Sequence, residues 1–137
     1  MANLLKLEIV TPDAVTYSEE VEMVTLPGVE GEMGIYPQHV PLLTEVIPGE
    51  VIVRKEGRDH FLAIGEGFVE ITGERVAIMT DMAIKAENID EAQAEEARRR
   101  AEARLAEQVD DEEGAMVSAA LAHSLAQLKV KRRQHHR

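Results

Sequence analysis

The chain has 137 residues, 45% of them hydrophobic and 30% charged, which is enough for one or two small globular domains. Its formal net charge of -11 argues against nucleic-acid binding, because phosphate binding needs concentrated Lys and Arg. The absence of cysteine from the sequence excludes disulfides, thiolate metal sites and a cysteine nucleophile.

Residues 4 to about 82 carry the pattern of β-strands. Four segments alternate apolar and polar side chains with period two, as half-buried strands do: KLEIV, EVIVRKE, FVEIT and RVAIMT. Glycine or proline recurs every few residues, and KEGRD and TGER have the composition of hairpin turns. Short strands with regular turn signals indicate an antiparallel sandwich or barrel.

Residues 26–44, LPGVEGEMGIYPQHVPLLT, combine three glycines, three prolines and one histidine, His39. Glycines at this density can cradle a phosphate, but this stretch has no Lys or Arg and carries Glu30 and Glu32. We therefore expect its glycines to form tight turns or bulges and its prolines to fix extended edges. The role of His39 stays open between a functional contact and the packing of a turn.

No catalytic or metal-binding pattern accompanies this stretch. His39 and His60 are isolated in the sequence, and His135 and His136 belong to a basic tail. No serine, histidine and acid combine into a nucleophilic site, and the acid pairs fit solvated strands and turns better than a catalytic dyad. We predict a chain that is not an enzyme and uses no metal or cofactor.

A change of composition divides the chain into a sandwich domain, 1–86, and a helical domain, 87–137. NIDEAQAEEARRRAEARLAEQV is rich in helix formers, with Asn88 placed as N-cap and Glu91 completing a capping box. VDDEEG is expected to end this helix, and a second helix is predicted from about Ala115 to Arg133. The short connection predicts an antiparallel hairpin of helices roughly 30 Å long.

The two predicted helices face each other largely through alanine. The expected seam comprises Ile89, Ala92, Ala97, Ala101, Leu105 and Val109 of the first helix, and Val117, Leu121, Leu125 and Leu128 with Ala119, Ala122 and Ala126 of the second. Burying a methyl group stabilises much less than burying a Leu, at about 2 kcal/mol. Two readings stay open: a hairpin that opens or docks elsewhere at modest cost, and a static one.

The charge is unevenly distributed along the chain. Residues 1–86 carry 15 acids and 6 bases, whereas the last nine residues, KVKRRQHHR, hold five bases and no acid. An acidic body with a basic tip suggests contact with an acidic protein surface. A solvated, frayed terminus fits the composition equally well.

Taken in order, several segments resemble the epsilon subunit of rotary F-type ATP synthases, whose mitochondrial counterpart is called delta. They are residues 26–44, EVIPGEVIV, AIGEGFVEI and AIKAENIDEAQAEEARRRAEARL, so the resemblance covers nearly the whole chain. Its most specific part is GEMGIYP, residues 31–37, followed by His39, Pro41 and LLT. The resemblance implies an α+β fold, in which an N-terminal antiparallel β-sandwich of about ten strands precedes a C-terminal antiparallel two-helix hairpin.

The resemblance also implies a noncatalytic subunit of the central stalk, which couples proton flow and rotation to ATP synthesis. Its implied partners are the gamma subunit, the c-ring of the membrane sector and the alpha/beta catalytic hexamer. In the family, one segment lies at the foot of the stalk, towards the c-ring and gamma. The residues that match this segment are Glu32, Met33, His39 and Pro41.

Bacterial relatives also use the helices to inhibit ATP hydrolysis. In them the hairpin extends along gamma, and basic groups of the second helix meet an acidic loop of the catalytic beta subunit. The basic residues in the matching region here are Lys129, Lys131, Arg132 and Arg133.

Nucleotide-binding relatives carry Ile or Leu and then Asp-x-x-Arg-Ala at the start of the first helix. This chain has Asp90 but Gln93 in place of the arginine, and an amide does not supply the cationic fork that grips phosphate. Arg98 and Arg100 are the remaining candidates, although Arg–Glu pairs along the helix are a commoner role. We predict weak or absent ATP binding; the alternative function is an ATP-sensing module whose hairpin closes on nucleotide.

No apolar run approaches the roughly 20 residues of a spanning helix, and MANLLKLEIV lacks the pattern of a signal peptide. We expect membrane contact only through the complex. The implied location is peripheral, on the cytoplasmic face of a bacterial inner membrane, or at the thylakoid if the chain is plastid-encoded.

Overall fold

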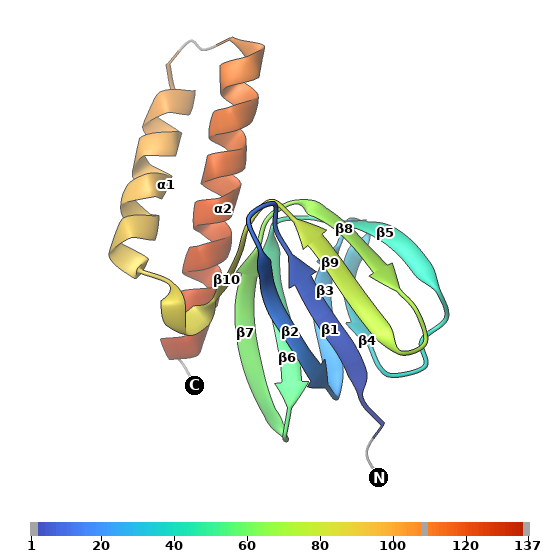
Figure 1. Ribbon diagram of the computed structural model, residues 1–137. Helices are drawn as coiled ribbons and strands as arrows, with labels where there is room; N and C mark the ends of the chain where they lie inside the picture. Colours follow the sequence, from blue (N-terminus) through green and yellow to red (C-terminus); the bar gives the residue numbers. More distant parts are fainter. Residues whose placement is uncertain (1–2, 108–109, 136–137) are drawn as a thin grey trace.

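The computed structural model of the chain describes residues 3–107 and 110–135, the last two of these as backbone only. They form a two-layered β-sandwich followed by a pair of helices at one side of it (Figure 1). The α+β architecture predicted from the sequence, strands first and a helical hairpin second, is confirmed.

Ten strands build the sandwich: β1 (Leu5–Val10), β2 (Val15–Val21), β3 (Met23–Gly28), β4 (Gly31–Ile35), β5 (Leu42–Val46), β6 (Gly49–Lys55), β7 (Arg58–Ile64), β8 (Gly67–Ile71), β9 (Arg75–Thr80) and β10 (Ala83–Lys85). One layer has the order β5-β8-β9-β1-β2 and the other β10-β7-β6-β3-β4, and the two are joined where Gly28 of β3 pairs with Val46 of β5. The strand pairs are antiparallel except β1 with β9, which is parallel.

The period-two segments of the sequence are strands because their alternate side chains fill the space between the layers. Leu5, Leu7 and Ile9 of β1 are at most 2% exposed, whereas the residues between them are only half-buried. The predicted turn KEGRD is also confirmed, since Glu56 (φ 54°) and Gly57 (φ 76°) have the positive φ angles of a type I′ hairpin. The core is therefore aliphatic, and hydrophobic burial is its main source of stability.

The helical part departs from the prediction at its caps. A 3₁₀ turn, η1 (Ala86–Asn88), precedes α1 (Glu91–Leu105), and Asp90 rather than Asn88 is the N-cap, accepting a hydrogen bond from the Gln93 N–H at 3.1 Å. The second helix, α2 (Asp111–His135), begins inside the acidic segment, where the Asp110 carboxylate accepts from the Glu113 N–H at 2.7 Å. The predicted starts at Asn88 and Ala115 were wrong, because an aspartate caps each helix closer to its acidic first turn.

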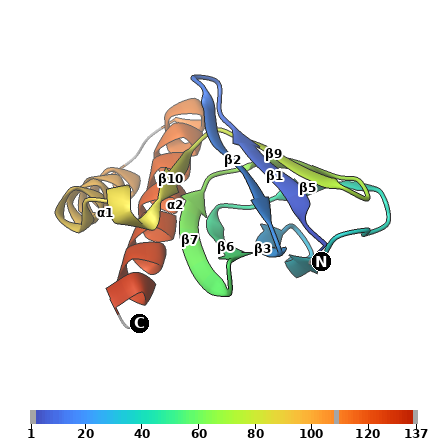
Figure 2. The ribbon, with the colours of Figure 1, turned by 60° about the horizontal axis from the view of Figure 1, so that its bottom comes forward.

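The predicted seam is wrong in part, because α2 packs against two surfaces. Figure 2 shows α2 between α1 and β7, so its buried side chains are shared between the other helix and the sheet. Ala126 and Val130 are buried with Phe61, Ala63, Ala86 and Ile89 in a small apolar cluster. Of the predicted seam residues, Leu125 is 47% exposed, Ala92 and Ala119 are exposed, and Val109 lies outside the described residues. None of the described helices is both long and apolar enough to cross a membrane.

Candidate interaction surfaces

The glycine- and proline-rich stretch forms the β3–β4 hairpin and the connection to β5. A Cβ at Gly28 would lie 2.8 Å from the carbonyl oxygen of Gly31 and 2.9 Å from Sδ of Met33, so the hairpin needs a glycine there. Gly31 itself has φ 131°, which L side chains rarely adopt. The glycines shape a tight turn, as predicted.

The four residues predicted for the foot of the stalk lie in two places on this stretch. Glu32 and Met33 belong to β4, the first exposed and the second half-buried, whereas His39 and Pro41 lie on the connection to β5. His39 Nδ1 is 2.6 Å from the carbonyl oxygen of Val40, and since that oxygen only accepts, Nδ1 carries the proton and donates. This contact packs a turn, but the half-exposed ring remains accessible. The same stretch exposes five large apolar side chains, Val29, Tyr36, Val40, Leu42 and Leu43, of which Val29 and Val40 were not singled out in the sequence.

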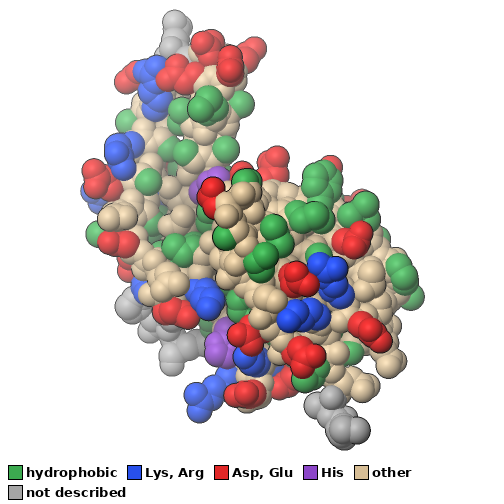
Figure 3. Space-filling model, in the orientation of Figure 1, with side chains coloured by type: hydrophobic (Ala, Val, Ile, Leu, Met, Phe, Trp, Pro, Cys, Tyr) green, Lys and Arg blue, Asp and Glu red, His purple; other side chains and the backbone are tan. Residues whose placement is uncertain are grey.

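A row of apolar side chains crosses the outer face of β8, β9, β1 and β2. Phe68 pairs with Met79, Met79 with Val10, and Val10 with Val15, so the four lie side by side in register. Phe68, Met79 and Val15 are 51%, 44% and 58% exposed, and Figure 3 shows hydrophobic side chains gathered over this face. We call these four residues the apolar row. Its sequence signal is a pair of consecutive apolar residues, such as Phe68 with Val69, because one member of each pair must face outward.

The basic end of α2 is engaged with the rest of the chain. Arg133 Nη1 lies 2.8 Å from Oε1 of Glu50, a side chain that is only 4% exposed, and its guanidinium is 5.7 Å from the ring centroid of Phe61. Lys131 donates to the carbonyl oxygen of Ala86 at 3.2 Å. Arg132 pairs with Glu91 at 3.3 Å and with Glu95 at 3.0 Å, whereas Lys129 is exposed. Three of the four predicted basic residues therefore hold α2 in place.

A cavity of about 340 Å³ lies between the first half of α1 and α2. Asp90, Gln93, Glu96 and Arg100 line it from α1, with Ser124 and Gln127 of α2 opposite. Arg100 is the one cationic side chain among the described residues that line this cavity, and two carboxylates accompany it. The arrangement is poor for a nucleotide phosphate, which needs concentrated positive charge.

Arg98, the other arginine considered for nucleotide binding, does not line this cavity. It pairs with Glu95 and, at 2.8 Å, with Glu102 on the face of α1. The hydrogen bonds with these carboxylates raise the pKa of the Arg98 guanidinium, and the hydrogen bond from Arg98 lowers the pKa of Glu95. The predicted Arg–Glu pairing explains Arg98, and Asp90 serves as the helix cap.

Among the described residues, no three His, Asp or Glu side chains lie close enough together to hold a metal ion. The side chains of His135 and His136 lie outside this description.

Comparisons with known proteins give a consistent result. The family described as "ATP synthase, Delta/Epsilon chain, beta-sandwich domain" matches residues 4–86, and "ATP synthase, Delta/Epsilon chain, long alpha-helix domain" matches residues 87–132. The chain is 42% identical over 134 residues to an ATP synthase epsilon chain of Dehalococcoides mccartyi, covering 96% of each chain. It is 44% identical over 126 residues to that of Herpetosiphon aurantiacus, covering 92% of this chain and 93% of the relative.

Two solved structures are similar in fold. A chain of the Euglena gracilis mitochondrial ATP synthase (OSCP/F1/c-ring) superposes with a TM-score of 0.76 at 25% identity, covering 93% of this chain and 80% of that one. A chain of the Tetrahymena thermophila mitochondrial ATP synthase (central stalk/c-ring) gives a TM-score of 0.61 at 12% identity, covering 95% of each, and shows the fold alone.

Proposed function

Because this chain belongs to the delta/epsilon family of ATP synthase chains, we propose that it is a noncatalytic central-stalk subunit of a rotary F-type ATP synthase. There it couples rotation of the c-ring and the gamma subunit to ATP synthesis. The observation that carries the proposal is the match of both halves of the chain, strands and helices, to chains of this one complex. The subunit is peripheral, on the cytoplasmic face of a bacterial inner membrane, and contacts the membrane only through the complex.

The apolar row is the surface that we assign to the gamma subunit. Phe68, Met79 and Val15 lie side by side and are exposed to water, which is unfavourable for apolar side chains. A contiguous apolar patch of this kind marks a surface that a partner covers. The row also lies on the layer opposite to β6 and β7, on which α2 packs, so gamma can bind it while the hairpin stays docked.

The edge formed by residues 31–43 is the surface that we assign to the foot of the stalk, facing the c-ring and gamma. Glu32, Met33, His39 and Pro41 supply its polar and apolar contacts, and Tyr36, Val40 and Leu43 add exposed apolar area. The glycine-shaped hairpin gives this edge a fixed conformation, which a coupling element needs in order to transmit torque.

The helical hairpin is the inhibitory element of the proposal. Its seam rests mainly on alanines, Leu128 and one small apolar cluster, so undocking is less costly than unfolding the sandwich. Separation of α2 from the sandwich and from α1 releases Arg133, Lys131 and Arg132 from their present partners, and these bases, with Lys129, then bind an acidic loop of the catalytic beta subunit.

Removal of the chain after residue 87 tests both roles. The remaining sandwich should bind gamma, while ATP hydrolysis by the assembled enzyme rises; unchanged hydrolysis would remove the inhibitory role and leave the coupling role. Replacing all four basic residues by Ala would remove the contact with the beta subunit and would also weaken the docked state, because Arg133 holds α2 on the sandwich. Lys129→Ala isolates the contact with the beta subunit, since Lys129 is exposed in the docked state.

A further inference from the structure

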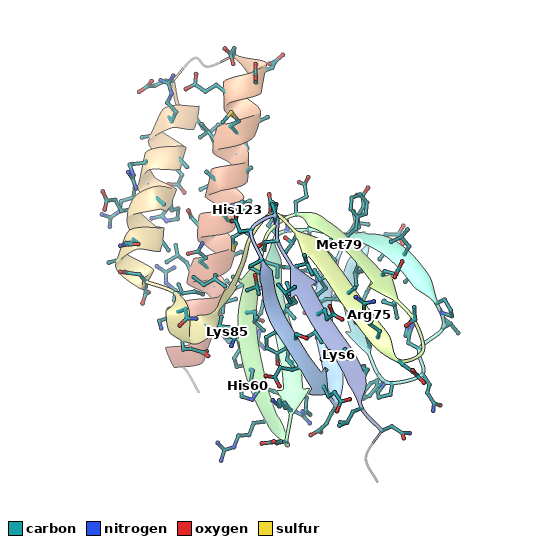
Figure 4. The ribbon with its side chains drawn as sticks, viewed as in Figure 1. Lys6, His60, Arg75, Met79, Lys85 and His123 are labelled. Atoms are coloured by element: carbon teal, nitrogen blue, oxygen red, sulfur yellow. The ribbon has the colours of Figure 1, made fainter. Side chains whose placement is uncertain are left out.

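α2 is attached to the sandwich at a second place, well away from its basic end. Nε2 of His123 lies 3.2 Å from both Oδ1 and Oδ2 of Asp81, on the connection between β9 and β10. Figure 4 shows His123 where α2 passes the end of the sheet. His123 and Arg133 are ten residues apart, so the two attachments are separated by roughly 15 Å along the helix.

The backbone around this pair is arranged to allow the contact. A Cβ at Gly65 would lie 2.0 Å from Oδ1 of Asp81 and 2.8 Å from Nε2 of His123, so the missing side chain leaves room for both groups. The Asp81 N–H donates to the carbonyl oxygen of Glu66 at 3.2 Å, and the neighbouring Thr80 hydroxyl donates to the same oxygen at 3.0 Å. The backbone at Asp81 is therefore held in position by the β7–β8 turn.

The charged groups around His123 are few. On α2 itself the sequence has no other charged residue between Glu113 and Lys129. On the sandwich the nearby acids are Asp81 and Glu66, and on α1 Glu96 and Arg100 line the cavity next to Ser124. Asp81 is the charged group that the His123 imidazole contacts directly. Protonation of the imidazole therefore acts mainly through this pair.

We propose that His123 and Asp81 form a pH-sensitive clasp that holds the helical hairpin on the sandwich. A neutral imidazole gives Asp81 one hydrogen bond, whereas an imidazolium adds the attraction of opposite charges. Protonation of the imidazole therefore favours the docked state, and loss of that proton at higher pH weakens the clasp. The Arg133 guanidinium keeps its charge throughout, so the two attachments respond differently to pH.

Distance measurements on the whole chain test the clasp. The sequence contains no cysteine, so Met116→Cys on α2 and Ser18→Cys on β2, both exposed, accept a donor and an acceptor dye. We expect the ratio of undocked to docked chains to rise about three- to fivefold between pH 5.5 and 8.0. His123→Gln and Asp81→Asn, which keep a hydrogen bond but remove the charge pair, should each abolish this response.

His60→Gln is the matched control, because His60 lies further along β7, away from His123 (Figure 4). This variant should keep the full response. A flat profile in the unsubstituted chain, the same response in His123→Gln and Asp81→Asn, or its loss in His60→Gln would each overturn the clasp. The measurement uses the isolated chain, so its outcome is independent of the role in ATP synthase.

Discussion

Arg133 at the end of α2 reaches Glu50 of β6 across 83 residues of sequence, with Nη1 2.8 Å from Oε1. The Glu50 carboxylate is buried, and the Arg133 guanidinium lies over the ring of Phe61 on the adjacent strand. One arginine therefore joins the ion pair and the apolar cluster beneath α2.

Arg133→Ala should weaken docking by about 1–2 kcal/mol, because the buried Glu50 charge loses the guanidinium while partial exposure of Arg133 limits the effect. Backbone hydrogen exchange along the second half of α2 should accelerate roughly tenfold, with little change in β6. Lys129→Ala, on the exposed side of the same helix, is the control and should leave the rates unchanged. Equal rates in both variants would show that Arg133 does not hold the helix.

Charges placed in the apolar row should disrupt binding to gamma without unfolding the sandwich. Phe68→Asp and Met79→Asp each add a carboxylate where we expect a desolvated contact, so the affinity should fall at least tenfold, or about 1.4 kcal/mol. The melting temperature should change little, because both side chains are about half exposed. Met116→Asp, on the exposed part of α2, should retain full affinity; an equal loss there would point to an indirect effect.

Titration calorimetry with ATP should detect no micromolar binding to the isolated chain. The interhelical cavity offers Arg100 but also Asp90 and Glu96, with Gln93 in the position where nucleotide-binding relatives have arginine. Gln93→Arg adds a guanidinium to the cavity lining and should raise the affinity about tenfold. Micromolar binding by the unsubstituted chain would contradict the prediction and support a nucleotide sensor.

Gly65→Ala should loosen the hairpin more than it destabilises the sandwich. The added methyl group overlaps Asp81 and approaches His123, so the pair must separate, at an expected cost of about 1–3 kcal/mol. Protease cleavage of the α1–α2 hairpin should become faster at pH 6. Gly73→Ala is the matched control, since a Cβ there meets no atom within 4 Å. If the two variants are cleaved at the same rate, the close approach at Gly65 has no role in docking.

Local patterns predict much of this fold and little of its long-range pairing. Strands such as β1 follow from alternating residues, Leu5, Leu7 and Ile9, because β1 is buried on one face only. The start of the first helix was misplaced because Asn88 and Asp90 are both good caps, and Asp90, next to the acidic first turn, is the one that caps α1. The contacts of Arg133 with Glu50 and of His123 with Asp81 join residues 83 and 42 positions apart, and no local spacing predicts them.

The parallel pairing of β1 with β9 also bears on how the protein is made. Lys6 of β1 lies opposite Arg75 of β9, so about 70 more residues must be synthesised after β1 before its parallel partner is present. Until then β1 and β2 form only an isolated hairpin, which is marginally stable in water. A chain that ends before β9 has no closed core, whereas residues up to 87 include all ten strands that the sandwich needs.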